Sequence, residues 1–260
     1  MKVGIIGVGM VGGAIKAVVE EHGGFKLAAY DKYKAIGKFE DVLDSDLCFV
    51  SVPTPTDAFL QDLRPLIDVL LNLSASSYAG LIVVKCTVLP GTMGRLAGLH
   101  SQLKIMHNPE FLTERNAMHD FKSQSHVLLS CPDTEAGSIA VEFYNKLLPK
   151  AMIALYSDYK TTELAKYLHN CFLATKVSFM NEFYDVCQKL GADYDLVSGA
   201  AKSQGMIGLS HLMVPGPDGQ RGFGGSCFPK DTSALAGSLP PEYLSILRAA
   251  MSSNRKVRND

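Results

Sequence analysis

The 260-residue chain lacks most of the features that mark membrane, disulfide-bonded or nucleic-acid-binding proteins. No apolar run reaches the about 18 residues that a membrane span needs. The 25 basic and 26 acidic residues give a net charge of −1, so nothing drives the whole chain toward nucleic acid or anionic lipid. The six cysteines form no CxxC pair. We therefore expect no disulfide framework, no metal site and a cytoplasmic location.

The first part of the chain alternates short apolar runs with helical stretches. The helical stretches are residues 14–21 and 63–73. The runs that read as strands are Val3–Ile6, Lys26–Tyr30, Leu47–Val52, Leu81–Val84, Lys104–Met106 and Val127–Leu129. Strands covered on both faces read as continuous apolar runs, as these do. The alternation predicts βαβ units, and hence an α/β fold with a parallel, Rossmann-type sheet.

The pattern changes near residue 155. From Ser157 to Leu190 the chain has no glycine or proline, which predicts one long helix or two with a kink, with Ser157 as N-cap and Gly191 beyond the end. There follow a helix at 194–202, a glycine- and proline-rich segment at 214–227, helices from Thr232 and a basic, solvated helix end with Arg255, Lys256 and Arg258. We predict an α/β domain at 1–155 and a mostly helical domain at 156–260.

A glycine-rich turn follows the first predicted strand. Gly7 permits the tight turn, Gly9 lets a pyrophosphate approach the backbone, and Gly12 allows close packing of helix on strand. Asp31 ends the next strand, where a carboxylate can bind the ribose diol and repel a 2′-phosphate. The alternative is a structural turn with a surface aspartate. The pattern favours an NAD site made by Gly7, Val8, Gly9, Met10, Val11, Gly12 and Asp31.

Cys227 lies in the segment GFGGSCFPKD at 222–231. The three glycines before it let a ligand approach the sulfur, Lys230 can favour the thiolate, and Asp231 can accept a proton. In an NAD enzyme such a thiol can capture an aldehyde and, after hydride loss, leave a thioester for water to cleave. These residues by themselves leave a buried structural cysteine equally open. The other five cysteines are predicted to lie in the core.

Six segments, in family order, resemble the UDP-glucose/GDP-mannose dehydrogenase family. They are GVGMVG at 7–12, SVPTPT at 51–56, KCTVLPGT at 85–92, NPEFLTERNA at 108–117, ELAKYLHNCFLATKVSFMNE at 163–182 and GFGGSCFPKD at 222–231. The resemblance spans nearly the whole chain and favours Cys227 as the nucleophile. It implies two-step, NAD-dependent oxidation of the C6 alcohol of a nucleotide sugar, with UDP-glucose expected, to a carboxylate used in polysaccharide synthesis.

The resemblance also implies roles for individual residues. Lys166 and Asn170, four apart on one helix face, would contact the substrate, and Lys166 would steady the developing alkoxide. The implied catalytic residues are Cys227, Lys166, Glu110, Asn170 and Asp231. The implied substrate contacts are Glu110, Phe111, Leu112, Lys166, Asn170 and Gly224. Further NAD contacts fall on Thr54, Thr56, Thr87, Glu114 and Lys230.

Three departures from the family pattern change what the resemblance implies. Arg115 replaces a glycine, and Met206 replaces the arginine that enters the neighbouring subunit's site, a contact that Arg221 or His211 would have to supply. Family members also continue past the point matching Asp260 with a nucleotide-gripping domain. We therefore expect this chain to lack that domain, to bind the nucleotide sugar poorly and to form a weak homodimer. The alternatives are a non-catalytic NAD-binding remnant and a β-hydroxyacid-type dehydrogenase, which uses no thiol.

Overall fold

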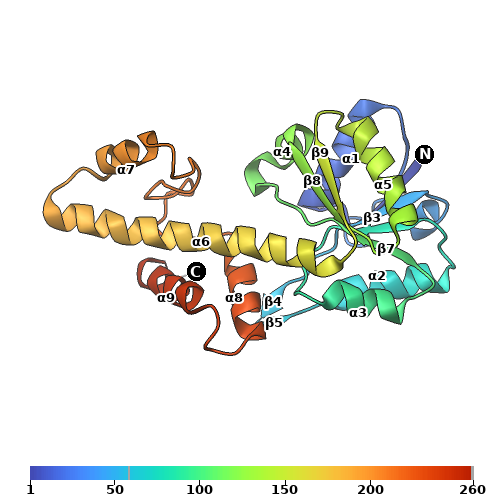
Figure 1. Cartoon of the computed structure of the whole chain (residues 1–260). Helices are drawn as coiled ribbons and strands as arrows, with labels where there is room; N and C mark the ends of the chain where they lie inside the picture. The colour runs from blue at the N-terminus through green and yellow to red at the C-terminus, as the bar shows by residue number, and fades with distance from the viewer. Residues whose placement is uncertain (58, 259–260) are drawn as a thin grey trace. The chain divides into compact units, whose positions relative to one another are not determined.

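The computed structural model describes residues 1–57 and 59–258 and divides into two compact units. The first unit contains residues 1–55 and 61–166, and the second contains residues 56–60 and those from 167 onward. The division falls inside the long helix α6 (Tyr159–Leu190), which is labelled in Figure 1. A domain boundary near residue 155 stays a prediction.

The first unit is built on a seven-stranded sheet with the order β2-β1-β3-β6-β7-β8-β9. Its elements are β1 (Lys2–Ile6), α1 (Met10–His22), β2 (Lys26–Tyr30), η1 (Phe39–Val42), β3 (Leu47–Val50), α2 (Arg64–Ala75), β6 (Leu81–Val84), α3 (Thr92–Leu99), β7 (Lys104–His107), η2 (Glu114–Asn116), α4 (Ala117–Ser123), β8 (His126–Ser130), α5 (Thr134–Leu147) and β9 (Met152–Tyr156). The α/β fold with a Rossmann-type sheet is confirmed.

One strand pair departs from the predicted parallel sheet. Strands β7 and β8 run antiparallel and meet at a single pair, His107 opposite Ser130, whereas the other neighbouring strands are parallel. The apolar runs that predicted the strands carry no information about direction, because a buried strand has the same composition either way. The carboxyl ends of β7 and β8 therefore meet.

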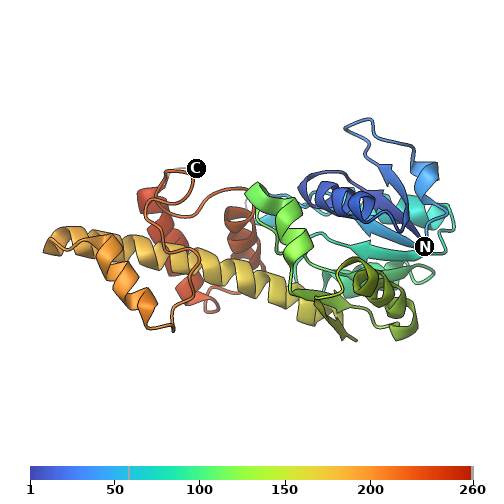
Figure 2. The same ribbon diagram turned by 90° about the horizontal axis from the view of Figure 1, so that it is seen from above.

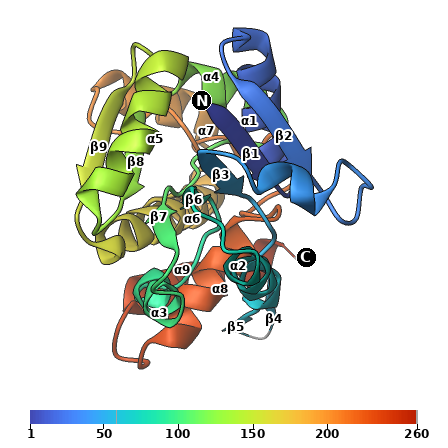
Figure 3. The same cartoon turned by 90° about the vertical axis from the view of Figure 1, so that its right-hand side faces the viewer.

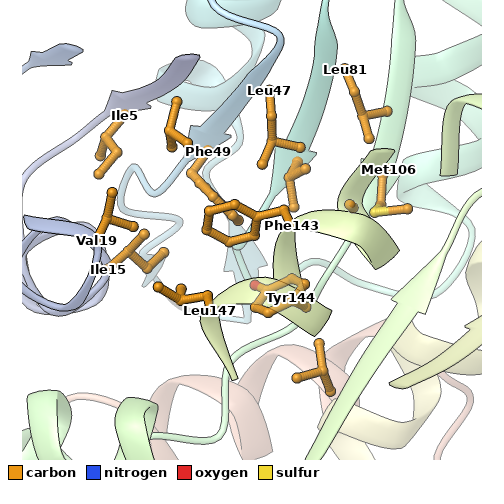
Figure 4. Packing of buried hydrophobic residues seen from close by; sticks show 14 of the residues in the cluster. Ile5, Ile15, Val19, Leu47, Phe49, Leu81, Met106, Phe143, Tyr144 and Leu147 are labelled. Carbon is orange, nitrogen blue, oxygen red and sulfur yellow. The ribbon is translucent and has the colours of Figure 1, made fainter. Parts of the chain in front are cut away.

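Helices cover both faces of the sheet (Figure 3). Alternate residues along each strand point to opposite faces, so Ile5 packs under α1 and α5 while Ile6 packs under α2 and α3. In Figure 4 the ring of Phe143, from α5, lies close to Phe49 of β3, with ring centroids 5.3 Å apart. Because both faces are buried, the carboxyl edge of the strands is left to carry polar residues.

The second unit is helical. It contains α6 from residue 167, β4 (Thr56–Asp57), α7 (Tyr194–Ser203), α8 (Phe228–Ser238) and α9 (Ser245–Val257); the short strand β5 (Leu60–Gln61) pairs with β4. Figure 2 shows α6 as one unbroken helix, which resolves the choice between one helix and two. The backbone at Gly191 has φ +70°, as predicted for the residue after the helix end. No helix in the described ranges is long and apolar enough to cross a membrane.

Two predicted helix starts in the second half of the chain differ from the structure, by one and by four residues. Asp158, rather than Ser157, caps α6, because its carboxylate accepts a hydrogen bond from Thr161 N at 2.9 Å. Helix α8 begins at Phe228 rather than at Thr232, with Cys227 as its N-cap. Pro229 lies in the first turn, where the missing N–H costs nothing. The thiol of Cys227 therefore lies at the amino end of a helix.

Candidate active site and cofactor site

The turn between β1 and α1 can form only with glycine at two positions. Gly7 has φ +88°, and a Cβ there would lie 2.6 Å from Ser51 O. A Cβ on Gly12 would lie 1.9 Å from the carbonyl oxygen of Gly7. By contrast, nothing lies within 4 Å of a Cβ built on Gly9, the N-cap of α1. The amino end of α1 has no capping side chain and no acid in its first turn, so it fits a pyrophosphate.

Asp31 is bound to this glycine turn. Its Oδ2 accepts from Val8 N at 2.8 Å, and its Oδ1 accepts from Tyr33 N and Lys34 N at 2.9 and 3.0 Å. Burial would raise the pKa of Asp31, but these N–H donors together lower it below its ordinary value. The carboxylate is therefore ionised and placed beside the turn, which fits the diol of an NAD ribose.

Two of the threonines implied by the resemblance meet after the ends of β3 and β6. Thr54 Oγ1 donates to Thr87 O at 2.8 Å, and Gln61 Nε2 donates to the same carbonyl at 2.9 Å. Thr56 belongs to the second compact unit, and Glu114 is exposed on η2. The structure thus joins Thr54 and Thr87, while cofactor contacts by Thr56 and Glu114 stay predictions.

Glu110 lies buried just after the carboxyl end of β7. Its Oε1 accepts from Phe111 N at 2.7 Å and Leu112 N at 3.2 Å, so Glu110 binds the backbone N–H groups of two residues that the resemblance implies as substrate contacts. Its Oε2 lies 3.0 Å from Lys85 Nζ. The side chains of Lys85 and Glu110 are 2% and 9% exposed, which makes this a buried ion pair.

Lys85 is a site residue that the sequence reasoning missed. Its ammonium also donates to Asn108 Oδ1 at 2.9 Å, and Asn108 accepts from the Tyr144 hydroxyl and donates to Leu128 O. Burial lowers the pKa of Lys85, against the attraction of Glu110. The available signal was a charge directly after the apolar run LIVV, at the end of a fully buried strand.

His107 joins β7 to its neighbours through its ring. Nε2 lies 3.2 Å from Cys86 O and so donates, which leaves Nδ1 to accept from Thr162 Oγ1 at 2.7 Å. Burial lowers the pKa of His107 to about 3, so the ring is neutral. This residue holds the start of the NPEFL segment and has a structural role.

The start of α6 brings two further groups to the first unit. Glu163 accepts from Gly91 N at 2.6 Å and Met93 N at 2.7 Å, and so caps the amino end of α3. Lys166 lies with Nζ 5.1 Å from the centre of the Phe111 ring. Lys166 therefore lies beside the NPEFL segment, and its contact with the substrate stays a prediction.

The second unit places three polar side chains beside the first turn of α8. The Asp231 side chain is 1% exposed and accepts from Asn170 Nδ2 at 2.5 Å. Lys230, which the sequence suggested as a partner of the thiol, forms its ion pair with Asp231 instead. Cys227 is partly exposed, while the other five cysteines are buried as predicted: Cys48, Cys86, Cys131, Cys171 and Cys187.

The glycine loop before Cys227 is covered by the end of α9. The guanidinium of Arg258 lies so close to Gly224 that a Cβ there would be 2.1 Å from Nη2. The Arg258 side chain is 7% exposed and pairs with Asp218 at 2.8 Å. The prediction of a solvated basic end is therefore wrong for Arg258, although Arg255 is exposed. The two departures from the family pattern, Arg115 and Met206, are both exposed.

The sheet, the glycine turn and its aspartate define a dinucleotide-binding protein of the Rossmann class. Comparisons with known proteins narrow this class. Residues 26–148 match the NAD-binding domain, and residues 160–256 the central domain, of the UDP-glucose/GDP-mannose dehydrogenase family. The chain belongs to this family, and its cofactor is NAD.

The chain is also similar to individual family members. It is 33% identical over 225 residues to UDP-glucose 6-dehydrogenase of Rickettsia bellii, covering 84% of this chain and 51% of that protein. It is 35% identical over 233 residues to UDP-glucose 6-dehydrogenase of Pseudomonas aeruginosa, with 84% and 50% covered. A solved UDP-glucose dehydrogenase from Pyrobaculum islandicum superposes with a TM-score of 0.83 at 26% identity, over 98% of this chain and 68% of that one. The chain spans about half the length of these curated relatives.

Proposed function

We propose that the protein is an NAD-dependent dehydrogenase that oxidises the C6 alcohol of a nucleotide sugar, UDP-glucose, to the carboxylate in two hydride transfers. The observation that carries the proposal is the group at the start of α8: the partly exposed Cys227, with Asp231 buried beside it and bonded to Asn170 and Lys230. A β-hydroxyacid-type dehydrogenase has no use for such a thiol.

In the first oxidation, side chains of the site remove the proton of the C6 hydroxyl and stabilise the resulting alkoxide. Bound NAD supplies the acceptor for each hydride. Asp231, held by Asn170, takes the proton of the C6 hydroxyl through a water molecule. Lys166 stabilises the developing alkoxide with its positive charge.

In the second oxidation Cys227 forms and then loses a covalent bond. The thiolate adds to the C6 aldehyde, and protonation of the oxygen gives a thiohemiacetal. Loss of that hydroxyl proton and of the C6 hydride gives a thioester. Water then attacks the carbonyl with Glu110 as base, and the C–S bond breaks to release the carboxylate and the thiolate. The sulfur of Cys227 belongs to the N-cap residue of α8.

We propose that the protein acts as a homodimer in the cytoplasm. Helix α6 carries a stripe of exposed apolar side chains at spacings of three, four and seven residues: Leu164, Leu168, Phe172, Phe179, Phe183, Val186 and Leu190. A stripe of this length on a water-soluble helix supports pairing with a second copy. The free cysteines support a reducing compartment. Leu168→Glu should shift the sedimentation coefficient from dimer to monomer.

A cysteine variant tests the proposal. Cys227→Ser should abolish uronate formation at millimolar UDP-glucose and leave NAD binding unchanged, because the fingerprint for NAD lies in the other compact unit. Cys187→Ser, at a buried position far along α6, is the matched control and should keep the activity. Uronate formation by the Cys227→Ser variant at the wild-type rate would overturn the proposed role of the thiol.

A further inference from the structure

The loop Gly222–Gly225 before Cys227 is held by a side chain from α9. Its backbone is left-handed at Gly222, with φ +72°, and at Gly225, with φ +77°. Asn254 Oδ1 accepts from Phe223 N at 2.7 Å, and Asn254 Nδ2 donates to Phe223 O at 2.9 Å. One buried amide thus satisfies both backbone groups of a loop residue.

A second side chain holds the loop one helical turn further on. The guanidinium of Arg258 lies against the backbone of Gly224, and its Nη1 donates to Gly222 O at 3.5 Å. Nη1 also lies 2.8 Å from Asp218 Oδ2. Asp218 belongs to a tight turn closed by a 2.7 Å bond from Gly216 N to Gln220 O, so it holds the guanidinium in place.

We propose that Asp218, Asn254 and Arg258, the loop clamp, are positioning residues for the Cys227 thiol. The inference rests on the proposed function of Cys227. Glycine backbone has many conformations to lose, so a loop of this composition does not fix the direction of its next side chain. The loop clamp fixes the backbone at residues 222–224 from outside. A displacement of about 1 Å in a reacting group can cost about 100-fold in rate.

Thiol labelling tests the loop clamp without needing turnover. We would treat the folded protein with iodoacetamide and follow each cysteine-containing peptide by mass spectrometry. Arg258→Ala should label Cys227 at least fivefold faster than wild type, because the released loop exposes the partly buried thiol. Asp218→Asn should give a similar increase, and the double variant no more than the larger single effect, since the two residues act as a pair. Arg255→Ala, which removes an exposed cation three residues before Arg258, should label at the wild-type rate.

Labelling of the five buried cysteines distinguishes a local change at Cys227 from a general loss of structure. They should stay unlabelled in all variants, whereas equal acceleration at all six would show that Arg258 merely stabilises the fold and would overturn the inference. Labelling of Cys227 at the wild-type rate in both single variants would overturn it as well. In the Arg258→Ala and Asp218→Asn variants, kcat for aldehyde oxidation should also drop at least tenfold, with NAD affinity unchanged. A wild-type protein that makes no uronate would refute the proposed function, while labelling would still report on the loop clamp.

Discussion

At the scale of single residues, two carboxylates allow direct energetic tests: Asp31 at the cofactor turn and Glu110 in the buried ion pair. Asp31 has three backbone donors, and the Glu110 carboxylate is shared between two N–H groups and Lys85. Both carboxylates accept hydrogen bonds from backbone N–H groups of their own site. Removing the charge of Asp31 should therefore change NAD affinity, and breaking the pair of Glu110 should change the free energy of unfolding.

Replacing Asp31 with alanine should weaken NAD binding and reduce the discrimination against NADP. A charge-assisted contact to the ribose diol contributes roughly 1.5–3 kcal/mol, or about ten- to a hundredfold in affinity. Calorimetric titration of both nucleotides measures the effect. Asp68→Ala, at an exposed position on α2, is the control. Unchanged NAD affinity in the Asp31→Ala variant would remove this residue from the cofactor site.

Replacing Lys85 with methionine should destabilise the fold by about 3–5 kcal/mol, because the Glu110 charge would stay buried without its partner. Urea unfolding gives the free energy. The double variant Lys85→Met/Glu110→Gln should recover much of the loss, since no buried charge remains. Lys122→Met breaks an exposed pair with Glu21 and should cost about 1 kcal/mol or less. A small effect in Lys85→Met would show that the pair is not the buried charge pair described above.

At the scale of elements, the junction of β6, β7 and α6 depends on His107. Its folded pKa, about 3, lies below the ordinary value of 6.5, so stability is complete above pH 6.5 and is lost as the pH falls toward 3. The loss is about 1.4 kcal/mol per pH unit, or about 2 kcal/mol at pH 5. Urea unfolding at pH 7 and pH 5 should show this extra loss in wild type and not in His107→Gln. Equal pH slopes in the two proteins would contradict the assignment.

The sequence was most informative about elements whose signals are local. β2 and β6 have their predicted bounds, and the glycine turn lies where the motif placed it. Strand β9 was not predicted, although Met152–Tyr156 is a continuous apolar run; it is an edge strand, and the residues at its two ends are exposed. The predicted strand at Leu47–Val52 ends at Val50, where the chain turns toward the threonine segment.

The parts of the site that the sequence could not predict depend on contacts far along the chain. Lys85 pairs with Glu110 across 25 residues, and Arg258 meets Asp218 across 40. The local sequence predicts a solvated charge at Arg258. It gives no sign that the guanidinium lies against Gly224, which is distant in the chain. The motif around Cys227 did indicate the residues that gather there, Asp231 and Lys230, but not that they pair with each other.

At the scale of the whole molecule, the chain spans about half the length of its curated relatives and carries both an NAD-binding unit and a helical unit with a thiol. The proposed function requires that each sugar molecule be oxidised twice. The most direct measurement counts NADH against UDP-glucose consumed to completion. The expected result is two NADH per sugar, with uronate as the product. A ratio of one, with an aldehyde as the final product, would contradict the claim and leave a simple alcohol dehydrogenase.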